Sequence, residues 1–335
     1  MSSDAAFLAE GLAALAPHLS PSASGIAGLK RLSGGASQET WAFDVTTPDG
    51  PLGFILRRPP GGAEIMASAQ AIGLATEAAV IKVAIAAGAP APRVAHVLAP
   101  GDRLGSGYVM DRLAGETIAR KILRDDAFAD ARLKLARQCG EALARIHAAP
   151  IDALPALPRL DARDQLDRYE EIYRSFDTPR PTFDLAFAML RRLAPQRQSV
   201  RLAHGDFRVG NLMVDADGLV AALDWELAHL GDPAEDLGWI CTPSWRFGQV
   251  DKPVGGFGDV HDLISAYHAA GGDAGVTTET VRFWTMFGSL KWGVMCLIMF
   301  RAFDSGADKT VERAAIGRRA SETELDLALM MKGLL

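Results

Sequence analysis

Hydrophobic residues recur with two different periods along the chain, and the change falls about a third of the way from the N-terminus. Before residue 110, short runs of β-branched and aromatic residues are separated by turn residues such as Pro48-Asp49-Gly50, which is typical of β-strands. One stretch in this part has helical spacing and ends at Gly88 and Pro90. The predicted strands lie within 28–58 (38–45 and 53–58 are the clearest runs), 93–98 and 107–112, and the predicted helix covers 70–87.

After residue 115 the hydrophobic spacing is mainly helical, apart from a strand-rich island at 200–224. Because strands and helices are segregated along the chain, we expect an α+β fold with two lobes. We expect a small strand-rich N-terminal lobe at 1–110, a hinge at 111–115 and a larger, mainly helical C-terminal lobe at 116–335. The predicted helices of the larger lobe lie near 127–149, 161–175, 182–194, 258–271, 277–303 and 309–333.

Composition narrows the class of protein. The 335 residues fit about two domains of ~150 residues each, and 49% hydrophobic with 23% charged residues indicates a globular protein. The net charge of −6 argues against a nucleic-acid binder, which needs a basic face. Cys139, Cys241 and Cys296 are too far apart for a zinc motif or a disulfide framework, which favours a reducing cytoplasm.

No targeting segment or membrane anchor is predicted. Asp4 and Glu10 occupy the region where a signal peptide needs positive charge, and Leu8, Leu12 and Leu15 predict a short amphipathic helix instead. The longest apolar tract, Trp292 to Phe300, has nine residues and is too short to span a bilayer. We therefore expect neither membrane insertion nor a polybasic lipid contact.

The strand-rich island holds the residues with the clearest chemistry. Asp217-Gly218 lies between two apolar runs and predicts a hairpin turn. A turn centred on these two residues would place Asn211 opposite Asp224, with Cβ atoms roughly 4.5–5.5 Å apart. An amide oxygen and a carboxylate at that spacing suit Mg²⁺, which prefers oxygen ligands.

Asp206 lies five residues before Asn211, in the loop that leads into the same hairpin. A carboxylate there is placed to orient an attacking hydroxyl during phosphoryl transfer, which depends mainly on positioning and charge neutralisation. The alternative is a surface hairpin with incidental acidic residues. Three oxygen ligands converging on one hairpin end favour the catalytic interpretation.

Three segments carry a resemblance to a known family: His-Gly-Asp-Phe-Arg-Val-Gly-Asn (204–211), Leu-Asp-Trp-Glu (223–226) and 227–239. With them the chain resembles the aminoglycoside phosphotransferase and choline kinase-like family, a small-molecule branch of the protein-kinase-like fold, and within it the branch related to acyl-CoA dehydrogenase-fused proteins. The resemblance implies that Asp206 is the catalytic base and that Asn211 and Asp224 hold Mg²⁺, with Glu226 a weaker candidate.

A small-residue loop lies between two predicted strands of the N-terminal lobe. Gly34 and Gly35 let backbone N–H groups approach phosphate oxygens closely, and Ser37 and Gln38 add side-chain donors. An ordinary hairpin can also carry Gly-Gly. Because the loop precedes a matching catalytic hairpin, we expect it to bind the phosphates of ATP.

The family has a lysine on the third strand, and this chain has none between Lys30 and Lys82. By alignment Arg57 takes its place and would hold the α and β phosphates, with Glu77 on the following helix as its ion-pair partner. Arginine is always charged and binds phosphate bidentately, so the replacement preserves the chemistry. Arg58 is the alternative cation, because neighbouring strand residues point to opposite faces.

The segment from Gly107 to Gly115 resembles the family's hinge, so adenine would use groups between Asp111 and Leu113. The leading hypothesis is an ATP-dependent phosphotransferase acting on a hydroxyl of a small molecule. A nucleotide-binding pseudokinase with a sensing or scaffolding role is the rival, favoured by the missing lysine. A protein kinase fits less well, because the chain after Asp224 is too short for a long activation segment.

The sequence leaves the acceptor open: an aminoglycoside, a hydroxyacyl compound or another hydroxylated metabolite, and likewise ATP against GTP and the oligomeric state. After Met110 the chain carries 28 basic and 33 acidic residues. This mild acidity neither requires nor excludes a cationic acceptor.

Overall fold

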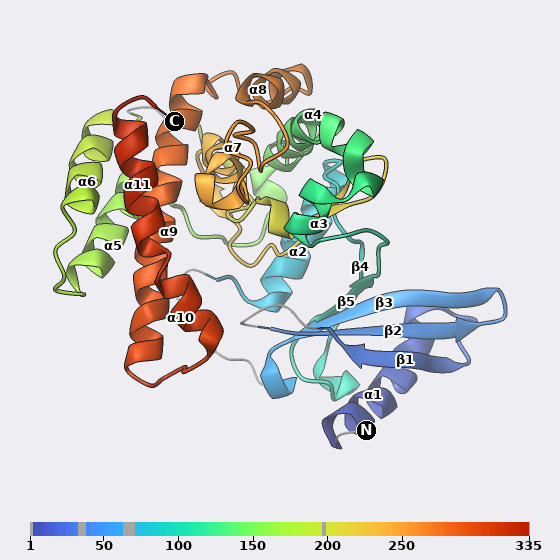
Figure 1. The fold of residues 1–335 in the computed structure, drawn as a ribbon. Coiled ribbons are helices and arrows are strands. Elements are labelled where there is room, and N and C mark those ends of the chain that lie inside the picture. Colours follow the sequence, from blue (N-terminus) through green and yellow to red (C-terminus); the bar gives the residue numbers. More distant parts are fainter. Residues whose placement is uncertain (1–2, 33–37, 63–70, 196–198, 335) are drawn as a thin grey trace. The chain divides into compact units, whose positions relative to one another are not determined.

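The computed structural model describes residues 3–32, 38–62, 71–195 and 199–334, and the chain forms two compact units (Figure 1). The first unit is Met1–Gly115 together with two later segments, Ala149–Leu157 and Val220–Ala228. The second unit is Glu116–Ala148, Pro158–Leu219 and His229–Leu335. Each unit therefore contains segments that are far apart in the sequence.

The first unit is built on a five-stranded antiparallel sheet with the strand order β1-β2-β3-β5-β4. The predicted strands and the predicted helix of this part are confirmed, with ends that differ by a few residues. The elements are α1 (Ser3–Leu19), β1 (Gly25–Arg31), β2 (Glu39–Thr47), β3 (Gly50–Arg58), α2 (Leu74–Ala86), β4 (Val94–Val97) and β5 (Tyr108–Asp111), with short 3₁₀ turns at Pro60–Gly62, Pro100–Asp102 and Ile151–Ala153.

Helix α1 supplies one side of the core of this unit. Its leucines Leu8, Leu12 and Leu15 are fully or almost fully buried and belong to one cluster with Phe43 and Phe54 of the sheet. Phe43 and Phe54 are directly opposed on β2 and β3. Because side chains alternate along β3, Phe54 and Leu56 face this core, whereas Arg57 belongs to the opposite face. The N-terminal helix predicted from the leucine spacing is confirmed.

The second unit is mainly helical. Most predicted helices are confirmed within a few residues. The short helix α3 was not predicted as a separate element. The elements are α3 (Ala119–Arg124), α4 (Ala129–His147), α5 (Ala162–Arg174), α6 (Pro181–Leu193), β6 (Arg201–Ala203), β7 (Leu212–Val214), β9 (His229–Gly231), α7 (Ala234–Cys241), α8 (Val260–Ala269), α9 (Thr278–Asp304), α10 (Val311–Gly317) and α11 (Ala320–Met331), with 3₁₀ turns at Asp126–Phe128, Val209–Asn211 and Pro243–Trp245.

Helix α7 approaches α9 closely because Gly238 has no side chain. A Cβ atom at Gly238 would lie 2.4 Å from Cβ of Trp284 on α9, which is too close for two carbon atoms. Helix α9 is long and apolar enough to cross a membrane by length and composition, and 67% of its apolar window is buried inside the structure. It packs against α7, α10 and α11, as a core helix does.

The segment 309–333 was expected to be one helix and is instead two, with a corner at Arg318 and Arg319. The reason lies at the end of α10, where Gly317 packs directly on α9. A Cβ atom there would lie 2.7 Å from Cβ of Phe300. The close contact fixes the end of α10, and α11 starts in a new direction at Ala320 (Figure 1).

The predicted turn at Asp217-Gly218 is wrong by one position. Asp215 N–H donates to Gly218 C=O at 2.9 Å, so the central turn residues are Ala216 and Asp217. The Asp215 carboxylate causes the shift, because it accepts from the N–H groups of Asp217 and Gly218 at 2.8 and 3.1 Å. The cross-strand counting that placed Asn211 opposite Asp224 therefore does not hold. Strand β8 (Leu219–Ala222) then passes into the first unit.

Candidate active site

Asp206 lies in the loop after β6 and is held by three donors of the second unit. Its carboxylate accepts from Trp239 Nε1 at 2.7 Å, from Arg208 Nε at 3.1 Å and from Asn211 Nδ2 at 2.6 Å. The side chain is 16% exposed, so it is held in place and still reachable. A carboxylate fixed in this way can accept a hydrogen bond from an incoming hydroxyl without first reorganising.

Asn211 ends the 3₁₀ turn Val209–Asn211 and is buried. Its Nδ2 group donates both to the backbone C=O of Asp206 at 3.0 Å and to the Asp206 carboxylate. Because the amide nitrogen donates its hydrogen bonds to Asp206, the amide oxygen is the atom of this side chain that can bind another group. A neutral oxygen ligand at this position suits a hard cation.

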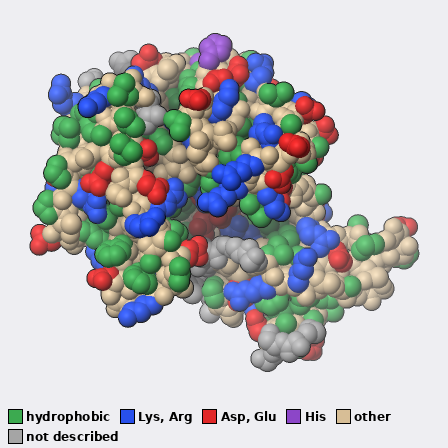
Figure 2. All heavy atoms as spheres, in the orientation of Figure 1, with side chains coloured by type: hydrophobic (Ala, Val, Ile, Leu, Met, Phe, Trp, Pro, Cys, Tyr) green, Lys and Arg blue, Asp and Glu red, His purple; other side chains and the backbone are tan. Residues whose placement is uncertain are grey.

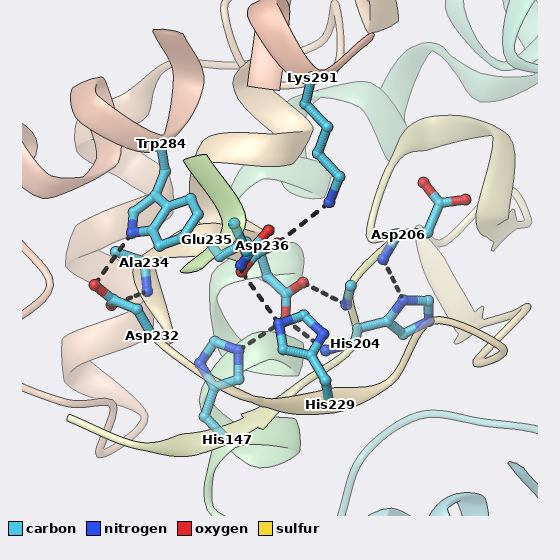
Figure 3. A network of polar contacts seen from close by, with 12 residues as sticks. His147, His204, Asp206, His229, Asp232, Ala234, Glu235, Asp236, Trp284 and Lys291 are labelled. Atoms are coloured by element: carbon cyan, nitrogen blue, oxygen red, sulfur yellow. Dashed lines mark hydrogen bonds and ion pairs between the residues drawn. The ribbon is translucent and has the colours of Figure 1, made fainter. Parts of the chain in front are cut away.

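The Asp206 loop is anchored by a fully buried carboxylate, Asp236 of α7 (Figure 3). Asp236 accepts from the backbone N–H groups of His204 and Gly205 at 2.7 and 2.9 Å, and it contacts His147 Nε2 at 3.0 Å. Burial alone would raise the pKa of this carboxyl, but the hydrogen bonds and the nearby histidines outweigh it and lower the pKa. Asp236 therefore stays ionised and fixes the loop two residues before Asp206.

A buried lysine of α9, Lys291, lies close enough to Asp206 to interact with it electrostatically. Lys291 of α9 is 3.4 Å from Glu235 Oε1 and lies over the ring of Trp239, at 5.1 Å from its centroid. Burial alone would lower the Lys291 pKa, but the opposing influence of Tyr169, Glu235 and Asp206 raises it. The lysine is thus a fixed positive charge near Asp206 (Figure 3).

In the first unit, the structure brings Arg57, Glu77 and Asp224 together. The Arg57 guanidinium is 2.8 Å from Asp224 Oδ1 and 3.7 Å from Glu77 Oε1. Glu77 is fully buried, hydrogen-bonds the Tyr108 hydroxyl and accepts from the N–H of Trp225 at 3.2 Å. The strand and the helix therefore place one cation between two carboxylates.

The electrostatics of this cluster are set by burial and by the short distances. Burial alone would lower the Arg57 pKa, but Glu77, Tyr108 and Asp224 raise it well above its usual value. Burial raises the pKa of Glu77, partly offset by Arg57. Asp224 has a backbone φ of 65°, in the left-handed region that non-glycine residues rarely adopt. Such strained positions often occur at functional sites.

Arg58, the alternative cation, belongs to a different network. Its guanidinium contacts Glu39 at 3.0 Å and Asp4 of α1 at 2.8 Å, and its side chain is 1% exposed. The two adjacent arginines thus face opposite sides of the sheet, as alternation requires. Arg57 is the one that meets Glu77.

Gly34, Gly35 and Ser37 of the predicted phosphate loop lie outside the described residues. Gln38 directly precedes β2, and its buried Oε1 has no hydrogen-bond partner within the described ranges. A buried polar atom of this kind needs a partner, which a ligand or water would supply.

The predicted hinge runs out of β5. The Asp111 carboxylate is bound by Arg93 at 2.7 and 2.9 Å, and the N–H groups of Asp111 and Arg112 donate to Arg93 C=O and Gly53 C=O. In the part of the chain that the structure describes, no acceptor is recorded for the Leu113 N–H. Leu113 therefore offers a backbone donor at the expected place. Glu226 contributes its C=O to the N–H of Ile72.

Three contacts were missed at the sequence level. Trp239, on the Asp206 carboxylate, lies in the quoted motif but was not singled out. Lys291 was detectable as the single charge within the apolar run from Trp284 to Phe300. Tyr108, which supports Glu77, had no sequence signal, because strand pairing alone brings β5 beside β3.

The metal-binding capacity of the described residues is limited to small sets of donors. Among the described residues, no group of three or more His, Cys, Asp or Glu side chains could hold a metal ion. Mg²⁺ in phosphoryl-transfer sites is commonly held by one or two protein oxygens plus substrate phosphates. Asn211 has a neutral amide oxygen and Asp224 a carboxylate, and each is an oxygen donor of the kind that Mg²⁺ prefers.

The family model described as "Phosphotransferase enzyme family" matches residues 28–271. Acyl-CoA dehydrogenase family member 10 of Mus musculus is 27% identical over 200 residues, which are 56% of this chain and 18% of that protein. The chain thus spans less than a fifth of the length of that relative.

Two solved structures share the fold. A candidate aminoglycoside phosphotransferase from Ralstonia eutropha JMP134 has a TM-score of 0.75 and 21% identity, covering 96% of this chain and 98% of the other. An aminoglycoside phosphotransferase solved with ADP and hygromycin B has a TM-score of 0.62 and 16% identity, covering 99% and 98%. These matches confirm the expected protein-kinase-like fold.

Proposed function

The chain belongs to the phosphotransferase enzyme family, and we propose that it transfers the γ-phosphate of ATP to a hydroxyl group of a small molecule. The family match confirms the predicted resemblance, and the acyl-CoA dehydrogenase relative fits the predicted branch. The observation that carries the proposal is the Asp206 carboxylate, held by Trp239, Arg208 and Asn211 and still partly exposed.

Asp206 is the proposed catalytic base. Its carboxylate accepts the hydrogen bond of the acceptor hydroxyl and takes the proton as the oxygen attacks the γ-phosphorus of ATP. The bond from this phosphorus to the β–γ bridging oxygen breaks, and ADP leaves with the electron pair. Trp239 and Arg208 donate to the same carboxylate, which keeps it oriented until the acceptor arrives. Asp236 holds the backbone of the loop, so this orientation does not depend on the acceptor.

Arg57 is the proposed phosphate-binding cation. Its planar guanidinium can bind two phosphate oxygens at once, and the ion pair with Glu77 holds this guanidinium in position. Asn211 and Asp224 would hold Mg²⁺, which neutralises the charge that develops on the transferred phosphate. In the present structure Arg57 also contacts Asp224, so nucleotide and metal would compete with this ion pair.

Gln38 and the backbone near Leu113 complete the proposed nucleotide site. A related phosphotransferase has been solved with ADP, which supports a nucleotide ligand here. All three cysteines are free and buried, which is consistent with the proposed cytoplasmic location. The proposed partner is a small molecule, with no role for nucleic acid or membrane.

The test replaces the proposed base. Asp206→Asn keeps the size of the side chain but cannot accept the proton, so turnover should fall by about 10²–10⁴-fold. Affinity for ATP with Mg²⁺, measured by calorimetry, should be unchanged. Asp217→Asn on the exposed turn of the same hairpin is the matched control and should keep full activity.

Two results would contradict the proposal. Near-normal turnover in Asp206→Asn would remove Asp206 from the mechanism. Nucleotide binding by the unmodified protein without Mg²⁺-dependent ATP consumption, across a broad acceptor panel, would instead favour the pseudokinase alternative.

A further inference from the structure

The second unit contains a cavity of about 640 Å³ whose charged lining is dominated by arginine. Five arginines line it, from α3, from the segment after Trp245 and from the corner between α10 and α11, against two carboxylates. We call it the arginine cavity. Figure 2 shows Lys and Arg side chains gathered where Figure 1 places α3. The arginines are Arg120, Arg124, Arg246, Arg318 and Arg319.

Most of these arginines have no carboxylate partner. Arg319 pairs with Glu322 at 2.9 Å. Across the ranges that the structure describes, no carboxylate lies within ion-pair distance of the other four arginines. This is unusual for a protein with a net charge of −6, in which acidic side chains outnumber basic ones. Positive charge is therefore concentrated in the cavity, where five arginines face only two carboxylates, Glu322 and Asp326.

Arg246 is the most constrained of the five. It is 7% exposed, and its guanidinium donates to the backbone carbonyl of Cys241 at 2.9 Å and to that of Val250 at 3.3 Å. Carbonyl groups orient a guanidinium but do not neutralise it. A buried cation costs free energy unless an anion compensates it. Asp326 of the lining offsets this cost only in part, because it is not within ion-pair distance and the pKa of Arg246 stays lowered. The geometry therefore holds Arg246 in place for a further anion.

A wall of aromatic rings connects the arginine cavity with Asp206. Trp239, which donates to Asp206, contacts Trp245 with 5.2 Å between ring centroids. Trp245 contacts Trp292 at 4.9 Å, and Arg319 of the cavity lies 5.7 Å over Trp292. Arg208, another donor to Asp206, lies 4.9 Å over the middle ring, Trp245. A continuous series of ring contacts thus runs from the donors of Asp206 to Arg319 of the arginine cavity.

The cavity also has an apolar part. Phe247, Val250 and Leu325 line it, and Val250 and Leu325 are more than half exposed. An anion that also carries an apolar portion would cover these side chains while its charged end meets the arginines. A purely polar ligand would leave the apolar surface in water.

We propose that the arginine cavity binds the anionic group of the acceptor, so that the acceptor is a hydroxylated carboxylate or phosphate ester and not a polycation. This inference rests on the proposed phosphotransferase function, which gives Asp206 the hydroxyl end of the same molecule. An aminoglycoside carries several positive charges, and the cluster of arginines would repel it. The arginines, in contrast, match the planar geometry of carboxylate and phosphate oxygens.

The binding test uses probes without a hydroxyl group, so that it does not depend on catalysis. Hexanoate, hexyl phosphate, hexanol and hexylamine share one apolar chain and differ in the head group. Calorimetry without nucleotide should show binding of the two anions, and the tighter of the two identifies the preferred group. Equal binding of hexylamine, or no binding of either anion at millimolar concentration, would overturn the proposal.

Variants locate the site. Arg318→Gln changes an exposed side chain that has no ion pair among the described residues, so it should fold normally and weaken anion binding by about tenfold. Arg246→Gln should weaken it at least as much, and its folding is checked separately because the residue is buried. Asp326→Asn removes a negative charge from the lining and should tighten binding. Arg192→Gln on α6, an exposed arginine outside the cavity, is the control.

A turnover experiment separates this inference from the proposed function. A panel of hydroxylated metabolites is grouped into anions, neutral compounds and cations, with hygromycin B among the cations, and ATP consumption is measured. Phosphorylation of anions that weakens in Arg318→Gln supports both proposals. Phosphorylation only of cations or neutral compounds overturns the anionic acceptor and leaves the phosphotransferase. Arginine-dependent anion binding without any ATP consumption overturns the phosphotransferase instead.

Discussion

Arg57 in the first unit and Arg246 in the second are both buried, yet their surroundings differ. Arg57 lies between the carboxylates of Glu77 and Asp224, whereas Arg246 is held by the backbone carbonyls of Cys241 and Val250. The effect on their pKa values is opposite. Burial lowers both, but the carboxylates reverse the effect at Arg57 and raise its pKa, while the pKa of Arg246 stays below its usual value.

The difference separates a cation with two carboxylates within ion-pair distance from a cation on which the Asp326 carboxylate acts only from farther away. A compensated cation stabilises the fold, and a ligand must compete with its partners to reach it. An uncompensated cation destabilises the fold slightly and is free to bind an anion at once. By this reasoning, Arg57 contributes to both stability and nucleotide binding, whereas Arg246 contributes mainly to recognition.

The sharpest way to test this contrast is to remove Arg57. Arg57→Ala leaves Glu77 fully buried without its cation, and the free energy of unfolding should fall by about 3–5 kcal/mol. Urea unfolding of the protein without ligand measures this loss. The control is Arg93→Ala, which breaks the partly exposed pair with Asp111 and should cost about 1 kcal/mol or less.

A small loss in Arg57→Ala, equal to that of Arg93→Ala, would mean that Glu77 is protonated in the folded protein. The direction of the Glu77 pKa, raised by burial, makes this comparison informative. Arg57→Lys should recover most of the stability, because it restores a cation on the same strand.

A double-mutant cycle sharpens the same side of the comparison. Arg57→Ala, Glu77→Ala and the double variant should give a coupling free energy of roughly 0.5–3 kcal/mol, because the two groups are direct partners. Additive losses in the same unfolding assay would show that Asp224 alone compensates Arg57.

The smallest expected effect is the pH dependence of anion binding in the arginine cavity. Burial raises the Asp326 pKa to about 6, with Arg246 and Arg319 opposing the shift and Glu322 adding to it. Below that pH Asp326 becomes neutral, so the cavity gains net positive charge. Affinity for hexyl sulfate, an anion that does not titrate in this range, should rise about threefold from pH 8 to pH 5.

Asp326→Asn should remove this pH dependence and bind at the higher level throughout. The effect of Asp326 on the free energy of unfolding has the opposite sign to that of a salt-bridged acid. The reason is that the pKa of Asp326 is higher in the folded protein than in the unfolded chain. The unfavourable contribution of Asp326 is complete above about pH 6 and vanishes below the unfolded value of ~3.9. An unchanged pH profile in Asp326→Asn would exclude Asp326 as the titrating group.

Much of the fold was predictable, because the spacing of hydrophobic residues along the chain differs between helices and strands. The leucine spacing at Leu8, Leu12 and Leu15 placed α1, and alternation on β3 predicted that Arg57 and Arg58 face opposite sides. Errors arose where a single residue determined the local course of the backbone. Asp215 shifted the hairpin turn through its carboxylate, and Gly317 ended α10 through a close contact.

The arginine cavity could not be predicted, because its residues are scattered from Arg120 to Asp326. Net charge is an average, and the mild acidity of the C-terminal part concealed a local excess of arginine. The residues of the Asp206 loop were different, since they lie within one short motif. Local motifs are visible in one sequence, whereas a site assembled from distant helix ends needs the fold.

The aromatic wall between Asp206 and the arginine cavity has an optical consequence. Trp239, Trp245 and Trp292 lie with 5.2 and 4.9 Å between neighbouring ring centroids, close enough for their excited states to couple. Such coupled indoles give an intense near-ultraviolet dichroism that depends on their mutual angles. An occupant that moves one ring changes this signal, so the protein carries its own chromophore at the junction of its two proposed substrate-binding groups.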